Sequence, residues 1–136
     1  MQITVETKVS APIERVWRAY TRPADIMAWN AASADWHTTA ATVDLREGGA
    51  FYSHMEAKDG SMGFDFEGTY TRIVPHALIE YRFGERTAKV MFSQETDGVV
   101  VRVAFDSEDT HSAEQQRVGW QAILDNFARH VEAQEA

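Results

Sequence analysis

The side chains that could do acid–base chemistry are few and lack partners. Catalysis of this kind needs a base with an orienting group, or two carboxylates, beside a pocket. His54 shares a strand face with Glu56, but alternation places that face opposite Phe51 and Met55, which we expect to point inward. The candidate bases are five histidines without the spacing of a metal-binding pair: His37, His54, His76, His111 and His130. We interpret all five as surface residues.

Other kinds of reactive site find no better support in the sequence. Asp65 and Glu67 alternate away from the neighbouring aromatic residues, so they form no carboxylate pair in the interior. Ser53 points inward without a base beside it. The absence of cysteine excludes thiolate ligands and nucleophiles, and Gly48-Gly49 is not followed by the helix that a phosphate loop requires. The sequence therefore predicts no catalytic residue, no metal and no cofactor.

Aromatic side chains, in contrast, are abundant and share one face. Alternation in the expected strands places them opposite the apolar stripe of a C-terminal helix. A set this aromatic, with few polar groups, suits a small hydrophobic ligand. The alternative is that the side chains fill the space themselves as an ordinary core. The residues expected to line a cavity are Trp29, Phe51, Ser53, Met55, Phe64, Phe66, Tyr70, Tyr81, Phe83, Phe92, Trp120 and Leu124.

Length and charge limit the class of protein. A chain of 136 residues fits one domain, residues 1–136, with a core of its own. Its net charge of −8 repels nucleic acid and anionic membranes, so neither is expected as a partner. The sequence has no stretch of membrane-spanning length and no signal-peptide pattern at its start. We expect a soluble cytoplasmic protein and leave a homodimer open.

Hydrophobic periodicity predicts helices at both ends of the chain and strands between them. Period-two alternation marks the strands, and apolar residues at steps of three and four mark the helices. Ser10 and Ser112 are expected to cap the first and last helices, with Gln115 completing a capping box for the last. The expected strands are residues 3–9, 36–45, 50–57, 62–74, 77–83, 86–94 and 99–107, and the expected helices are 10–21, 24–29 and 114–131.

This β-α-α-β6-α order predicts an α+β fold, in which a seven-stranded antiparallel sheet curves around the long C-terminal helix. The helix stripe that includes Trp120 and Leu124 would cover the sheet, with Gly119 letting the helix come close. Trp17 lies on the apolar face of the first helix and is assigned to the core. Trp29 ends the second helix and is assigned to the cavity entrance.

Four segments, in order along the whole chain, resemble the heat-shock-protein-90 ATPase activator-like branch of the START-like (SRPBCC) superfamily. Each segment alone is a weak signal, but four in the right order are specific for the family and the fold. They are not specific for a function. The segments are "SAPIERVWRAYTRPADIMAWN", "LREGGAFYSHM", "FEGTYTRIVPHALIEY" and "VGWQAILDNFARHV".

The resemblance implies a helix-grip fold, in which the sheet wraps around the last helix and leaves a cavity between them. Members of the superfamily bind hydrophobic small molecules, act as cyclases or hydrolases on polyketide-like substrates, or contact the 90-kDa heat-shock chaperone. For this chain we expect binding of a small hydrophobic molecule. A cyclase- or hydrolase-type enzyme acting on a polyketide-like or aromatic substrate, and a chaperone-interaction module, are the alternatives.

Overall fold

The computed structural model describes residues 1–134, so residues 135 and 136 of the expected domain lie outside the described residues. The order of elements confirms the predicted α+β class, with element ends that differ by a few residues from those expected. The elements are β1 (Gln2–Val9), α1 (Ile13–Thr21), α2 (Pro23–Trp29), β2 (Trp36–Val43), β3 (Ala50–Ala57), β4 (Gly63–Val74), β5 (Leu78–Phe83), β6 (Arg86–Glu95), β7 (Gly98–Asp106) and α3 (Ala113–Ala133).

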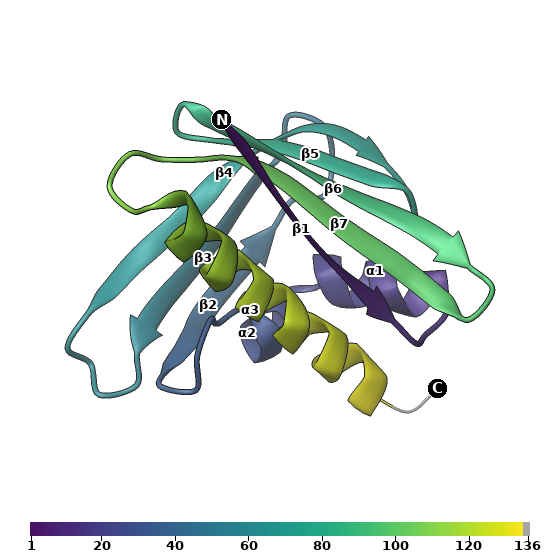
Figure 1. The fold of residues 1–136 in the computed structure, drawn as a ribbon, viewed down its shortest axis with the longest axis horizontal. Coiled ribbons are helices and arrows are strands. Elements are labelled where there is room, and N and C mark those ends of the chain that lie inside the picture. Colours follow the sequence, from purple (N-terminus) through teal and green to yellow (C-terminus); the bar gives the residue numbers. More distant parts are fainter. Residues whose placement is uncertain (135–136) are drawn as a thin grey trace.

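The strands form one antiparallel sheet in the order β1-β7-β6-β5-β4-β3-β2. From β2 to β7 each strand pairs with the next in sequence, as short turns favour. β1 completes the sheet beside β7, where Val5 lies opposite Val103. The sheet is curled, and all three helices lie on its concave side (Figure 1). The seven-stranded helix-grip arrangement is therefore confirmed.

The two N-terminal helices begin differently from what the sequence suggested. Pro12 is the N-cap of α1 and makes no side-chain capping bond. Ser10, the expected cap, lies before it and donates its backbone N–H to the Glu132 carboxylate at 2.9 Å. Arg22 is extended and separates α1 from α2, which starts with Pro23 in the first turn, where a missing N–H costs nothing. The expectation for Ser10 was therefore wrong.

α3 begins with the predicted capping box. The Ser112 hydroxyl accepts the backbone N–H of Gln115, and the Gln115 side-chain oxygen accepts the backbone N–H of Ser112. Leu124, Phe127 and Val131 are buried on the face that meets the sheet. Among residues 1–134, no helix is both long and apolar enough to cross a membrane.

The expected role of Gly119 was wrong. A Cβ atom built at Gly119 would have no neighbour within 4 Å, and the residue is partly exposed. Consecutive helical residues are about 100° apart around the axis, so Gly119 faces solvent while Trp120 faces the sheet. The close contact lies instead at Gly68 on β4, where a Cβ would overlap the Arg82 carbonyl oxygen on β5 and press on the Phe51 ring.

The interior has two halves that differ in side-chain type. The aliphatic half lies under β1, β6 and β7, and the C-terminal part of α3 covers it. The aromatic half lies under β3, β4 and β5. The aliphatic half contains Ile3, Val5, Val9, Val90, Val99 and Val101, all buried to within a few per cent, and the aromatic half contains Phe51, Phe66, Tyr70, Tyr81 and Phe83.

Candidate functional site

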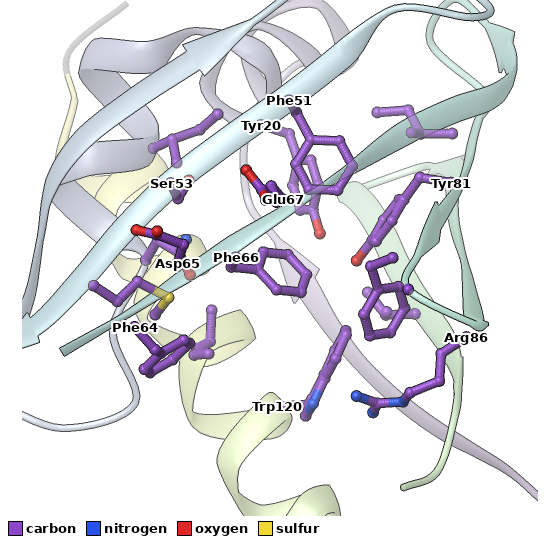
Figure 2. Close-up of a pocket in the computed structure, with 18 of the residues that line it drawn as sticks. Tyr20, Phe51, Ser53, Phe64, Asp65, Phe66, Glu67, Tyr81, Arg86 and Trp120 are labelled. Atoms are coloured by element: carbon purple, nitrogen blue, oxygen red, sulfur yellow. The ribbon is translucent and has the colours of Figure 1, made fainter.

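A cavity of about 620 Å³ lies between the aromatic half of the sheet and the N-terminal part of α3. The side chains of β3, β4 and β5 form one wall, and Trp120 of α3 lies across from them (Figure 2). Leu124 of α3 also lines the cavity. Tyr20 of α1, with Ile26 and Trp29 of α2, lines the cavity from the side of the N-terminal helices. This volume lies within the range of about 300–1,000 Å³ typical of small-molecule sites.

Every residue that the sequence placed on the cavity wall lies there except Phe92. Phe92 is buried behind Tyr20, with its ring 5.6 Å from the Tyr20 ring and 5.2 Å from that of Trp17. Trp17 is thus in the core as expected. That the wall residues contact a ligand stays a prediction. They are Trp29, Phe51, Ser53, Met55, Phe64, Phe66, Tyr70, Tyr81, Phe83, Trp120 and Leu124.

The wall is built from rings that meet edge to face or at a tilt. Phe51 lies 5.2 Å from Tyr70 and 5.0 Å from Tyr81, measured between ring centroids. Phe66 lies 5.4 Å from Phe83, and its other neighbour across the cavity is Trp120. Rings in such contacts touch along narrow edges, so they leave space that compact aliphatic groups would fill.

Trp120 is held in place by a flat stack on the aliphatic side. Its ring lies 3.9 Å from that of Phe105 on β7, with only 9° between the two planes. Phe105 is completely buried, whereas Trp120 keeps part of its surface. One face of the indole is therefore used for packing, and the cavity borders the remainder.

Trp29 does not form the entrance that the sequence suggested. It is only 6% exposed, and its indole N–H donates to the Ala19 carbonyl of α1 at 2.9 Å. Its ring packs against Tyr20 and Phe127, each with centroids 5.1 Å away. Trp29 therefore closes the cavity at the helices, and the tertiary hydrogen bond that fixes it has no signal in the local sequence.

The loop between β7 and α3 contributes charged residues that the sequence reasoning missed. His111 borders the cavity, although we had assigned it to the plain surface. Its backbone N–H and its Nδ1 lie 2.7 and 3.1 Å from the Glu108 carboxylate. Desolvation acts to raise the pKa of Glu108, but the interactions with His111 and a hydrogen bond from Thr110 together outweigh it and hold this pKa below its usual value.

Gln116 holds this loop against α3. It is buried, and its side-chain amide donates to the carbonyls of Glu108 and His111 at 3.1 and 2.9 Å. Its side-chain oxygen accepts the Glu108 backbone N–H at 2.9 Å. The sequence did contain a signal for this contact. Gln116 lies one helical turn before Trp120, and a polar side chain on that side of the helix must find hydrogen-bond partners when it is buried.

The histidine with the shortest hydrogen-bond distance to a carboxylate, His54, lies on the outer face of the sheet, as expected. His54 Nδ1 is 2.7 Å from Asp65, and the Tyr52 hydroxyl donates to the same carboxylate at 2.9 Å. The hydrogen bond to Asp65 raises the pKa of His54, and those from His54 and Tyr52 lower the pKa of Asp65. Asp65 and Glu67 border the cavity, but the Asp65 carboxylate is bound on the outer face.

Two further observations concern histidines and metals. His130 is partly buried and its Nε2 lies 2.8 Å from Asp25, so it joins α3 to α2 rather than standing free on the surface. Within residues 1–134 no group of three or more histidine, cysteine or acidic side chains could hold a metal ion.

Comparison with known proteins shows the family. A family model described as "Activator of Hsp90 ATPase homolog 1-like protein" matches residues 10–132. An AHSA1-like protein from Aeromonas hydrophila is 48% identical, with 98% of this chain and 93% of that chain covered and a TM-score of 0.92.

Two further solved structures agree. A protein from Cytophaga hutchinsonii is 43% identical, with 99% of this chain and 97% of that chain covered and a TM-score of 0.82. One from Chromobacterium violaceum is 27% identical, with coverage of 98% and 99% and a TM-score of 0.88. A search of curated proteins gave no match. The chain therefore belongs to the Activator of Hsp90 ATPase homolog 1-like family, as its four sequence segments indicated.

Proposed function

We propose that this protein binds a small hydrophobic molecule in the cavity between the sheet and α3. The observation that carries the proposal is the open volume of about 620 Å³ behind an aromatic wall. An empty apolar space of this size lowers the free energy of unfolding, because its lining loses packing contacts. An apolar ligand would restore those contacts, and the few polar groups of the wall would set its orientation.

The proposal is tested by titration with the neutral fluorescent probe N-phenyl-1-naphthylamine. Saturable fluorescence enhancement at a stoichiometry of about one is expected, since there is one aromatic cavity of this kind among the described residues. Ile123 of α3 lines the cavity, so Ile123→Trp should obstruct it and weaken probe binding.

A matched control lies on the same helix. Val118 is 58% exposed and does not line the cavity, so Val118→Trp makes the same change without affecting the site. Equal probe binding by the two variants, or a wild-type signal that rises without saturation, would exclude the proposal.

A cyclase- or hydrolase-type enzyme is the second candidate, and one observation favours it. His111 and Glu108 form a histidine–carboxylate pair at the border of the cavity, which is the arrangement of an oriented general base. Native mass spectrometry of the gently purified protein can separate the candidates. A retained molecule that stays unchanged on incubation supports a binder. Turnover that stops in His111→Gln supports the enzyme.

A further inference from the structure

Three tyrosines from three different elements meet at the cavity. Tyr20 comes from α1, Tyr70 from β4 and Tyr81 from β5, and all three line the space. In Figure 2 the hydroxyl oxygens of Tyr20 and Tyr81 point into the same part of the cavity. Tyr20 and Tyr70 also act electrostatically to raise the pKa of Tyr81. Strand alternation predicted that Tyr70 and Tyr81 face inward, but nothing local in the sequence predicted that Tyr20 would join them.

None of these three hydroxyls has a hydrogen-bond partner within residues 1–134. Tyr52 on the outer face differs, since its hydroxyl donates to Asp65 at 2.9 Å. Tyr20 also keeps accessible surface although burial strongly raises its pKa, so that surface belongs to the cavity wall. The three hydroxyls are not sealed in the core, because Arg15 Nε is the one fully buried side-chain polar atom without a partner among the described residues. They therefore keep surface open to the cavity and are free to donate to a ligand there.

We propose that the hydroxyls of Tyr20, Tyr70 and Tyr81 recognise a neutral oxygen acceptor, such as a carbonyl, on an otherwise apolar ligand. This rests on the proposed function and adds the chemical class of the ligand. An acceptor oxygen can take hydrogen bonds from two of the hydroxyls at once, since it has two lone pairs. A purely apolar ligand would leave all of the hydroxyls without partners.

The electrostatics of this end of the cavity favour a neutral acceptor over an anion. Burial raises the pKa of Tyr70 to about 12 and that of Tyr81 well above its usual value, so both hydroxyls stay protonated donors. The Asp44 carboxylate also raises the pKa of Tyr70, so the charge that acts on this hydroxyl is negative. A buried carboxylate on the ligand would thus lack a compensating charge beside Tyr70.

The nearest cation of the wall is already engaged. The Arg86 guanidinium lies 4.6 Å from the centre of the Phe83 ring, and its Nε donates to the Asp106 carbonyl at 3.0 Å. Arg86 acts to lower the pKa of Tyr81, but burial outweighs it. Arg86 therefore lies over the Phe83 ring at the cavity wall.

The test uses fluorene and 9-fluorenone, which share a flat tricyclic frame and differ by one carbonyl. Both compete with N-phenyl-1-naphthylamine for the wild-type protein. Fluorene is the more apolar of the two, so hydrophobicity alone would make it the stronger competitor. We expect the reverse, with fluorenone effective at about tenfold lower concentration, as two net hydrogen bonds would give.

Single Tyr20→Phe and Tyr81→Phe variants remove one hydroxyl each and keep the ring. Each should reduce the preference for fluorenone several-fold and leave fluorene binding nearly unchanged. Tyr52→Phe is the matched control, because its hydroxyl lies on the outer face and should not affect either ligand. The infrared carbonyl stretch of bound fluorenone gives a second readout: it should shift to lower frequency in the wild type, and the shift should shrink in Tyr81→Phe.

The outcomes separate this inference from the proposed function. If the naphthylamine probe does not bind saturably, the proposed function fails. If the probe and both tricyclic compounds bind, but fluorenone has no advantage and no shifted stretch, the hydroxyls do not recognise an acceptor and the inference is overturned while binding stands. An advantage that persists in a triple variant, Tyr20→Phe with Tyr70→Phe and Tyr81→Phe, also overturns it, because the carbonyl would then be bound elsewhere.

Discussion

The aliphatic and aromatic halves of the interior are covered by the same helix and the same sheet, yet one is filled and the other is hollow. Val9, Val90 and Val99 are completely inaccessible, whereas Phe51, Tyr81 and Phe83 each keep a small exposed fraction. Branched aliphatic groups on the pleated surface interdigitate and close the gap to the helix. Rings that meet at their edges hold the two layers apart. In this fold the choice of side chain, and not the backbone alone, decides where a cavity forms.

Trp120 stands at the boundary between the halves. It stacks on Phe105, the last buried ring of the aliphatic side, and faces Phe66 and Phe83 across the cavity. The stacked Phe105 ring is in close contact with Trp120. The ring centroids of Phe66 and Phe83 are farther away, at 6.4 and 6.0 Å from that of Trp120. The same residue therefore packs tightly on one side and loosely on the other.

The largest expected effect is on the free energy of unfolding, when one phenylalanine is truncated in the filled part of the interior and one at the cavity. Phe127 is completely buried where α3 meets Tyr20 and Trp29, so Phe127→Ala should lower the free energy of unfolding by about 3–5 kcal/mol. Phe66 already borders empty space, so Phe66→Ala should cost about 2 kcal/mol, close to the transfer term alone. Urea denaturation measures both. Equal losses would mean that the aromatic half is as well packed as the rest.

The next effect tests the tightest point of the aromatic half. Gly68→Ala places a Cβ against the Arg82 carbonyl oxygen, which belongs to the backbone of β5 and cannot turn away. We expect a loss of about 1–3 kcal/mol, larger than the gain from reduced backbone freedom in the unfolded chain. The midpoint of thermal unfolding should fall. An unchanged midpoint in Gly68→Ala would contradict this expectation and show that β4 and β5 can move apart at this position.

A smaller effect of opposite sign is expected on α3. Gly119 faces open space at helical φ and ψ, so Gly119→Ala should raise the free energy of unfolding by up to about 1 kcal/mol. Probe binding should be unchanged, since Gly119 does not line the cavity. A destabilised variant would argue for a contact of the helix at this point that the structure does not contain.

The smallest effect concerns the outer face of the aromatic half. The pKa of His54 is raised by Asp65, so the stabilisation from protonated His54 is complete below its unfolded pKa of about 6.5 and is lost as pH rises through the folded pKa. The difference in melting temperature between wild type and His54→Gln should be larger at pH 5.5 than at pH 8.5. Added salt should reduce it, because the pair is exposed. A pH-independent difference would contradict this assignment.

Alternation was sufficient to predict most of the cavity wall, because each strand position has only two faces to choose from. It placed Phe51, Tyr70 and Tyr81 correctly relative to the sheet. It failed for Phe92, which also faces inward but is covered by Tyr20 from α1. The covering depends on where a helix docks, and no pattern within β6 encodes that.

Three other features were not predicted by strand alternation. Trp29 is buried because α1 offers it the Ala19 carbonyl, and His111 reaches the cavity because Gln116 folds the preceding loop against α3. Gly119 was misread because a glycine beside a tryptophan suggested close packing, although the helical period places the two on different sides. Hydrophobic periodicity was sufficient to predict where the helices and strands lie. Hydrogen bonds outside this pattern determine which residues close and border the cavity.

The position of β1 has a consequence for how the protein is made. Gln2 pairs with Asp106 and Val9 with Val99, so the first strand to leave the ribosome finds its neighbour in the sheet near the opposite end of the chain. At a synthesis rate of 5–20 residues per second, β1 waits about ten seconds for β7. The strands from β2 to β6 pair with sequence neighbours and have no such delay. During translation the aromatic strands of the sheet can therefore pair first, whereas the densely packed part, which needs Ile3, Val5 and Val9, and the α3 wall of the cavity are completed later.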